Sequence, residues 1–177
     1  MMGGDPKRTR LLAMDVDGVL TDGTLYLTAS GDEMKAFHVR DGMGIALALC
    51  GGLEIAFVTG RSSDLVRRRA TELGVRHVLE GIHDKRAALM ELAERLGLAP
   101  AEIAFVGDDL NDLPALSCCG LPVAVADAPQ QVRAAAAWIT EAPGGRGAIR
   151  EVAERILEAQ GKLDEAIARY LSGRTRQ

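Results

Sequence analysis

Two aspartates stand two residues apart, directly after an apolar run near the N-terminus. The stretch reads LLAMDVDGVLTDG, and the two residues are Asp15 and Asp17. On an extended segment, side chains two residues apart point in the same direction. Carboxylates held this close repel each other and resist burial, so a positive group must offset their charge. The pair therefore indicates a site that binds a cation.

A third aspartate, Asp108, ends a later apolar run with the sequence IAFVGD. If that run and the run before Asp15 form adjacent strands, three carboxylates converge at one edge of a sheet. Carboxylate oxygens are the ligands that suit Mg²⁺, which also retains several waters. A bound Mg²⁺ would offset the repulsion and neutralise charge on a phosphate oxygen. The pattern therefore predicts a magnesium site for phosphate chemistry.

The other groups that phosphoryl transfer needs are also present in the chain. An aspartate can act as the nucleophile through an aspartyl-phosphate intermediate, and a neighbouring carboxylate can serve as acid and then base. Donors to the transferring oxygens are also required, and they could come from Thr59 and the backbone of Gly60 and Arg61. Lys85 stands at the start of a helical segment, where it could pair with Asp15 and the phosphate.

Apolar runs alternate with segments of helical spacing. The expected strands are 11–16, 54–59, 76–81, 103–108, 121–126 and 138–140, and the expected helices include 41–50, 62–74, 83–97 and 147–159. A hairpin is expected within residues 24–39, with its turn at Ser30–Gly31–Asp32. This alternation predicts an α/β fold with a parallel sheet and right-handed crossovers. Ligands bind at the carboxyl ends of the strands in such folds, where the aspartates lie.

Composition narrows the class of protein. The 177 residues are 47% apolar and 26% charged, which suits one globular domain with a core over about 10–160 and a tail over about 161–177. A net charge of −4 and 3% aromatic residues argue against nucleic-acid binding. We find no apolar run near the roughly 20 residues of a membrane span, no apolar leader segment and no disulfide or zinc pattern among three cysteines. A cytoplasmic protein is expected.

Four ordered segments resemble the motifs of the haloacid dehalogenase (HAD) superfamily of phosphohydrolases. They are DVDGVLTDG, VTGRSS, the lysine at position 85 and GDDLND, within a match from residue 11 to about 150. The resemblance implies a Rossmann-like fold, with Asp15 as nucleophile and Asp17 as acid/base. It implies Mg²⁺ bound by Asp15, the main-chain carbonyl of Asp17, and Asp108. Asp112 would support the site from behind these ligands or bind the ion through water.

A closer similarity is to the 3-deoxy-D-manno-octulosonate 8-phosphate (KDO 8-phosphate) phosphatase family. The segments DGVLTDG with the following hairpin, FHVRDGMGI, TGRSSDLVRRRATELG and APGGRGAIREV all resemble it. The resemblance implies a hairpin flap without a cap domain, and a homotetramer in which one subunit's hairpin covers its neighbour's site. It implies that the sugar-phosphate pocket is shaped by Asp41, Gly42, Arg61 and Arg146, and that the basic tail at Arg174–Arg176 reaches an active site. The glycines of PGGRG suggest a mobile loop that favours anions.

We therefore expect a Mg²⁺-dependent phosphatase that converts KDO 8-phosphate to KDO and phosphate for lipopolysaccharide precursor synthesis. One alternative keeps the chemistry but takes a nine-carbon substrate, KDN 9-phosphate. A second is a non-catalytic HAD-like assembly domain, which the four intact motifs disfavour. A third is a receiver-like switch with a long-lived aspartyl phosphate, whereas Asp17 should speed the hydrolysis of such an intermediate.

Overall fold

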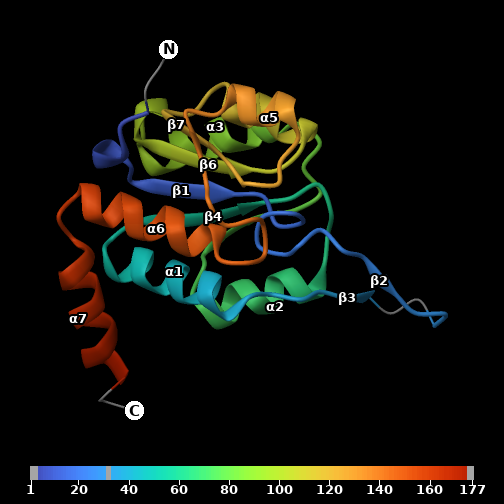
Figure 1. Cartoon of the computed structure of the whole chain (residues 1–177), viewed down its shortest axis with the longest axis horizontal. Helices are drawn as coiled ribbons and strands as arrows, with labels where there is room; N and C mark the ends of the chain where they lie inside the picture. Colours follow the sequence, from blue (N-terminus) through green and yellow to red (C-terminus); the bar gives the residue numbers. More distant parts are fainter. Residues whose placement is uncertain (1–3, 31–32, 175–177) are drawn as a thin grey trace.

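A six-stranded parallel sheet forms the centre of the molecule (Figure 1). The computed structural model describes residues 4–30 and 33–174. The strands run in the order β5-β4-β1-β6-β7-β8. They are β1 (Leu11–Met14), β4 (Glu54–Val58), β5 (His77–Leu79), β6 (Ile103–Gly107), β7 (Leu121–Ala124) and β8 (Trp138–Ile139). Since β1 pairs with both β4 and β6, the two strands that end near the aspartates lie side by side, which confirms the predicted parallel α/β sheet.

Helices cover both faces of this sheet. They are α1 (Val39–Cys50), α2 (Asp64–Leu73), α3 (Lys85–Leu96), α4 (Leu113–Leu116), α5 (Gln130–Ala135), α6 (Ala148–Ala159) and α7 (Leu163–Arg174). In Figure 1, α3 and α5 lie on one side of the sheet, whereas α1, α2 and α6 lie on the other. The last helix, α7, packs against α1 and α6. No helix in the described part of the chain has the length and apolar character needed to cross a membrane.

The central strands are apolar along their whole length because both faces of the sheet are covered. All four residues of β1 are fully buried, as are Phe57 of β4 and Phe105 of β6. Burial of a large apolar side chain contributes about 1.5–3 kcal/mol relative to an exposed one. The core therefore holds β1, β4 and β6 rigidly and fixes the loops that follow them.

Residues that favour helix termini stand at the end of α2 and at the start of α3. Helix α2 ends at Gly74, which has a left-handed φ of +76°, and the Asp84 side chain caps α3 by accepting from Ala87 N at 2.9 Å. This cap places Lys85 at the first position of α3. One prediction was wrong: the helix expected from Asp41 begins at Val39, with His38 as its N-cap.

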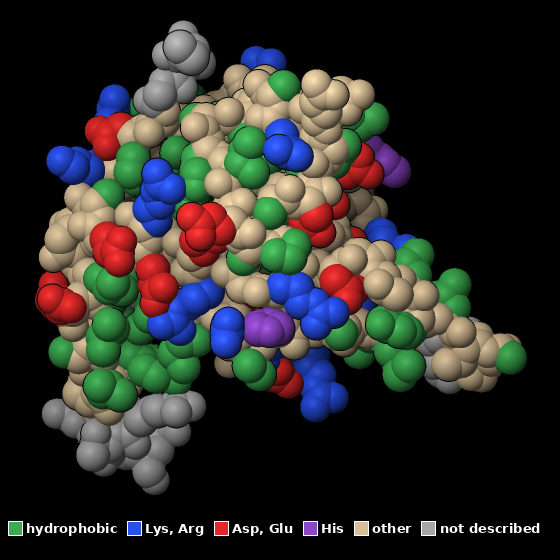
Figure 2. All heavy atoms as spheres, in the orientation of Figure 1, with side chains coloured by type: hydrophobic (Ala, Val, Ile, Leu, Met, Phe, Trp, Pro, Cys, Tyr) green, Lys and Arg blue, Asp and Glu red, His purple; other side chains and the backbone are tan. Residues whose placement is uncertain are grey.

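The predicted hairpin is present but its strands are short. β2 (Tyr26–Leu27) and β3 (Glu33–Met34) pair in antiparallel register and project from the body of the molecule (Figure 1). Part of the predicted turn, residues 31–32, lies outside the described residues. Figure 2 shows that apolar side chains gather on this projection. Its exposed large apolar residues are Leu25, Tyr26, Leu27 and Met34.

Candidate active site

Three carboxylates meet at the carboxyl ends of β1 and β6. Oxygens of Asp15, Asp108 and Asp112 lie within 4.8 Å of one another. Asp15 follows β1 directly, and Asp108 follows β6 directly. Asp15 is 5% exposed and Asp112 is fully buried. Two separate segments thus bring acidic side chains together as expected, but the third carboxylate of the cluster is Asp112 and not Asp17.

Lys85 lies between two of these carboxylates. Its Nζ is 2.9 Å from Asp15 Oδ2 and 2.7 Å from Asp112 Oδ1, and its side chain is 1% exposed. Burial lowers the pKa of this ammonium group, but the two carboxylates outweigh that effect and raise the pKa above its ordinary value. Lys85 is therefore positively charged at neutral pH and offsets part of the acidic charge.

Asp112 organises the turn that follows β6. Its Oδ2 accepts hydrogen bonds from Asp108 N at 2.9 Å and Asp109 N at 3.3 Å, while its Oδ1 contacts Lys85. A Cβ at Gly107 would lie 2.6 Å from Asp112 Cβ, so only glycine fits at that position. Both oxygens of Asp112 are thus engaged by the protein, and they fix the position of Asp108.

The surroundings of the other two carboxylates, Asp15 and Asp108, disfavour their ionised forms. Burial raises the pKa of Asp15 to about 6, and the nearby Asp112 adds to this rise while Lys85 opposes it. Burial also raises the pKa of Asp108 to about 8, with further contributions from Asp112 and Asp15. Ionised forms of both side chains at neutral pH call for an additional cation.

The donor set at this position fits Mg²⁺. Asp108 Oδ1 is buried and has no hydrogen-bond partner among the described residues. Gly18, with φ +95°, passes so close that a Cβ there would lie 2.0 Å from Asp108 Oδ2. The site has a buried oxygen without a partner, more carboxylates than positive side chains, and only oxygen atoms as donors. These features match the preferences of a hard divalent cation. Asp15 and Asp108 supply the carboxylates that such an ion would contact.

A small cleft of about 150 Å³ opens beside these carboxylates. It is lined by Asp15, Asp17, Thr59, Gly60, Arg61, Asp108, Asp109 and Asn111. The loop after β4 therefore faces the loops after β1 and β6, as the sequence predicts. Thr59 is buried, and its Oγ1 accepts from Arg61 N at 3.2 Å, which leaves the hydroxyl hydrogen free to donate into the cleft.

Two residues at the cleft were missed by the sequence reasoning. Asn111 lines the cleft wall from the GDDLND segment. Lys35, directly after β3, forms an ion pair with Asp17 of the cleft wall, and its side chain is 2% exposed. The alternation of Glu33 and Lys35 in a strand-like segment places both on one face, but it does not say that this face meets Asp17.

Asp41 faces away from this cleft. Its Oδ2 accepts from Gly147 N at 3.0 Å, and its Oδ1 accepts from Ile149 N at 2.9 Å and Arg150 N at 3.1 Å. The side chain therefore caps the N-terminus of α6. Burial raises the pKa of Asp41, and the backbone donors oppose that rise. Its role in this chain is to join α1 to α6.

This contact gives a stability prediction. Asp41→Ala is expected to lower the free energy of unfolding by about 2–3 kcal/mol, because three N–H groups at the start of α6 lose their acceptor in buried or partly buried positions. Asp41→Asn keeps one acceptor oxygen and should cost clearly less. Urea denaturation followed by circular dichroism measures both. Equal stability of wild type and Asp41→Ala would contradict the assignment.

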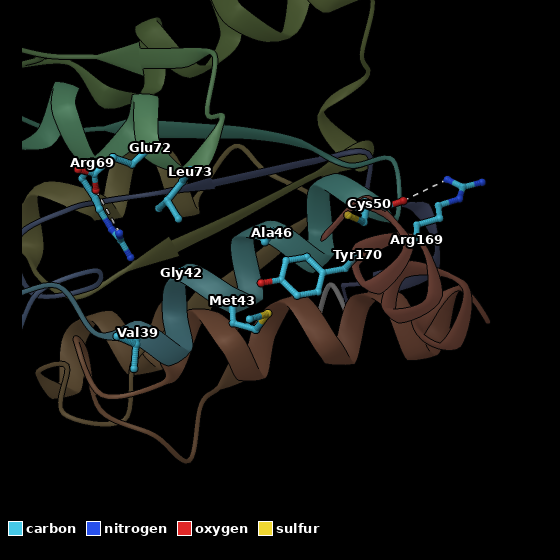
Figure 3. Close-up of a pocket in the computed structure, with 11 residues that line it drawn as sticks. Val39, Gly42, Met43, Ala46, Cys50, Arg69, Glu72, Leu73, Arg169 and Tyr170 are labelled. Atoms are coloured by element: carbon cyan, nitrogen blue, oxygen red, sulfur yellow. Dashed lines mark hydrogen bonds and ion pairs between the residues drawn. The ribbon is translucent and has the colours of Figure 1, made fainter. Parts of the chain in front are cut away.

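Gly42 also lies outside the cleft, beside a larger hollow of about 600 Å³ between α1, α2 and α7 (Figure 3). A Cβ at Gly42 would lie 2.4 Å from Arg69 Nη2, so glycine leaves room for that side chain to cross α1. Met43 and Tyr170 line the same hollow. The carboxylate cluster is elsewhere, so this hollow is not the catalytic site.

The PGGRG segment is packed rather than open to anions, which corrects the sequence interpretation. Gly145 N donates to Val19 O at 2.8 Å, and Gly144 N donates to Asp127 Oδ1 at 3.0 Å. These backbone donors are therefore unavailable to a ligand. Arg146 is exposed and its Nη2 lies 3.1 Å from Asp22 Oδ2.

The predicted role of the basic tail is not tested by the described residues. The side chain of Arg174 and residues 175–177 lie outside the described part of the structure. The expectation that Arg174–Arg176 reaches an active site stays a prediction.

Fold and site together define a haloacid dehalogenase-like hydrolase, and the family model of that description matches residues 77–149. The chain belongs to the KDO 8-phosphate phosphatase family. It is 50% identical over 157 residues to 3-deoxy-D-manno-octulosonate 8-phosphate phosphatase KdsC of Escherichia coli K12, covering 89% of this chain and 84% of that protein.

Solved structures agree with this membership. The Moraxella catarrhalis KDO 8-phosphate phosphatase, in complex with magnesium, phosphate and KDO, has a TM-score of 0.91 and 44% identity, covering 94% of this chain and 96% of that chain. The cobalt-bound enzyme of Haemophilus influenzae has a TM-score of 0.87 and 41% identity, covering 90% of this chain and 93% of that chain.

Proposed function

We propose that this protein is a Mg²⁺-dependent phosphatase that hydrolyses KDO 8-phosphate to KDO and inorganic phosphate. The observation that carries the chemistry is the cluster of Asp15, Asp108 and Asp112 around Lys85, with one buried carboxylate oxygen left without a partner. The relatives supply the substrate: the Moraxella protein holds magnesium, phosphate and KDO together. The reaction belongs to lipopolysaccharide precursor synthesis in the cytoplasm.

In the first step, a carboxylate oxygen of Asp15 attacks phosphorus and the bond from phosphorus to the sugar oxygen breaks. Asp17 gives a proton to the departing sugar oxygen, because an alkoxide is a poor leaving group. In the second step, Asp17 takes a proton from a water that attacks the aspartyl phosphate. Phosphate leaves and Asp15 is regenerated.

The remaining groups of the cleft bind and balance charge. Thr59 and the backbone N–H groups of Gly60 and Arg61 donate to the phosphoryl oxygens. Lys85 stays protonated and holds Asp15 in position through the 2.9 Å contact. When bound by Asp15, Asp108 and the carbonyl of Asp17, Mg²⁺ supplies positive charge to the phosphate oxygens.

The projecting hairpin is an argument for an oligomer. Its exposed apolar side chains favour burial against another subunit. The cleft beside the hairpin is small and open, and a neighbour's hairpin would exclude water from it. We therefore propose a homotetramer in which hairpins cover neighbouring sites. Size-exclusion chromatography with light scattering should give four times the chain mass, whereas a monomer would contradict the shared site.

A substrate panel tests the proposed reaction. Free phosphate is measured with KDO 8-phosphate, KDN 9-phosphate and p-nitrophenyl phosphate, each with Mg²⁺ and with EDTA. We expect the highest kcat/KM on KDO 8-phosphate and no turnover in EDTA. A higher kcat/KM on KDN 9-phosphate would assign the protein to the nine-carbon substrate. No release from any compound would favour an assembly domain.

A further inference from the structure

The hairpin carries a lysine whose charge is buried although the hairpin itself is exposed. The side chain of Lys35 is 2% exposed, whereas Met34 beside it is 57% exposed. A buried ammonium group is costly unless carboxylates pair with it. Lys35 therefore has a defined place in the structure rather than a solvated surface position.

Lys35 is the centre of a chain of ion pairs across the cleft. Its Nζ pairs with Asp17 Oδ1 and lies 3.4 Å from Glu33 Oε1. The same Glu33 oxygen lies 3.0 Å from Arg61 Nη2. The chain Asp17–Lys35–Glu33–Arg61 thus connects the loop after β1, the hairpin and the loop after β4.

The two aspartates of the first motif are held in different ways. Asp15 is fixed by Val16 N at 2.7 Å and by Lys85, both from the body of the fold. The Asp17 carboxylate is 22% exposed at the cleft and pairs with Lys35 of the hairpin. A carboxylate at a partly open position samples several rotamers unless a hydrogen-bonded partner favours one of them. Lys35 supplies that partner.

We propose that Lys35 is a positioning residue for the phosphatase reaction, holding the Asp17 carboxylate at the leaving-group side of the cleft. It acts through Asp17 and does not touch the substrate. The orientation of Asp17 therefore depends on how the hairpin packs against its own subunit. The ion pair between Glu33 and Arg61 helps to hold the hairpin there. This inference rests on the proposed function.

A double-mutant cycle tests the role. The variants are Lys35→Met, Lys35→Arg, Asp17→Asn and Lys35→Met with Asp17→Asn, assayed on KDO 8-phosphate with Mg²⁺ at high enzyme concentration. Lys35→Met should lower kcat about 10- to 100-fold, since misplacing a reacting group costs up to this much. KM should stay within about twofold, because substrate binding is untouched. Lys35→Arg should restore most of the lost kcat.

The decisive comparison is in the Asp17→Asn background. There Lys35→Met should change kcat by less than about threefold, because the residue through which it acts is already lost. Equal losses in both backgrounds would overturn the inference, as would an unchanged kcat. A large rise in KM with kcat preserved would also overturn it, because Lys35 would then bind substrate.

Controls separate this result from folding and from the proposed function. Lys162→Met removes an exposed lysine in the turn before α7 and should match wild type. Thermal unfolding checks each variant, and Lys35→Gln replaces Lys35→Met if the latter does not fold. Wild-type protein that releases no phosphate overturns the proposed function, whereas an active Lys35→Met variant with unchanged kcat overturns only the role of Lys35.

Discussion

Replacement of Asp15 by asparagine is expected to lower kcat on KDO 8-phosphate by at least about 10⁴-fold, a loss of the size seen when a nucleophile is removed. The amide is a far poorer nucleophile than a carboxylate, so the aspartyl phosphate does not form. The asparagine oxygen can still accept from Val16 N or contact Lys85, so the fold around β1 should persist. Phosphate release under saturating substrate and Mg²⁺ measures the effect.

The matched control is Asp164→Asn, which removes an exposed aspartate in the first turn of α7. That variant should keep wild-type kcat. Circular dichroism and thermal unfolding of Asp15→Asn establish that the loss is chemical. If Asp15→Asn kept more than about 1% of wild-type kcat, the covalent route through this side chain would be wrong.

Asp108→Asn is expected to give the second large effect, because it removes a carboxylate that would contact Mg²⁺. The ion supplies several kcal/mol of charge stabilisation, so we expect kcat to fall by about 10³-fold. The thermal stabilisation that Mg²⁺ gives the wild type should also be lost. The two measurements are phosphate release and the midpoint of thermal unfolding with and without Mg²⁺. Asp109→Asn, one residue along in the same loop, is the comparison variant and should keep the thermal response to Mg²⁺.

The same substitution should stabilise the protein when Mg²⁺ is absent. The pKa of Asp108 in the folded chain is about 8, which is above the 3.8 of an unperturbed aspartate. The folded state therefore holds this proton more tightly than the unfolded chain, so the contribution of Asp108 to stability is complete below about pH 4 and is lost as pH rises through about 8. Asp108→Asn should remove this loss at pH 8, with a higher unfolding midpoint than metal-free wild type.

Proton release on Mg²⁺ binding checks this interpretation independently. At pH 7 a group with a pKa of about 8 is mostly protonated, and the ion requires the carboxylate. Calorimetric titration in buffers of different ionisation enthalpy should show release of about one proton for each Mg²⁺ bound. Binding without proton release at pH 7 would contradict the raised pKa of Asp108.

The sequence predicted the features that depend on local pattern. Apolar runs ending in Asp15 and Asp108 became neighbouring parallel strands, because strands covered on both faces are apolar along their length. Gly74 ended α2 as expected, since only glycine readily takes its left-handed backbone conformation. Lys85 was expected at the start of a helical segment, and it occupies the first position of α3. Of these residues, Asp15, Asp108 and Lys85 belong to the candidate site.

The features that escaped prediction depend on contacts between distant segments. Asp41 was expected to open its own helix, but its carboxylate caps α6, more than 100 residues later in the chain. Lys35 contacts Asp17 only because the hairpin folds back against the loop after β1. Spacing along the sequence carries no signal for either contact, because each is set by how packed elements meet. The PGGRG loop is likewise closed by the neighbouring turn.

The central claim is that Asp15 attacks phosphorus beside a divalent cation held by Asp15 and Asp108. A crystal structure of the protein with Mg²⁺ and beryllium fluoride, a mimic of the aspartyl phosphate, tests it most directly. The expected result is beryllium bonded to a carboxylate oxygen of Asp15 and Mg²⁺ in contact with Asp15 and Asp108. Beryllium fluoride on another side chain, or Mg²⁺ bound away from Asp108, would contradict the account.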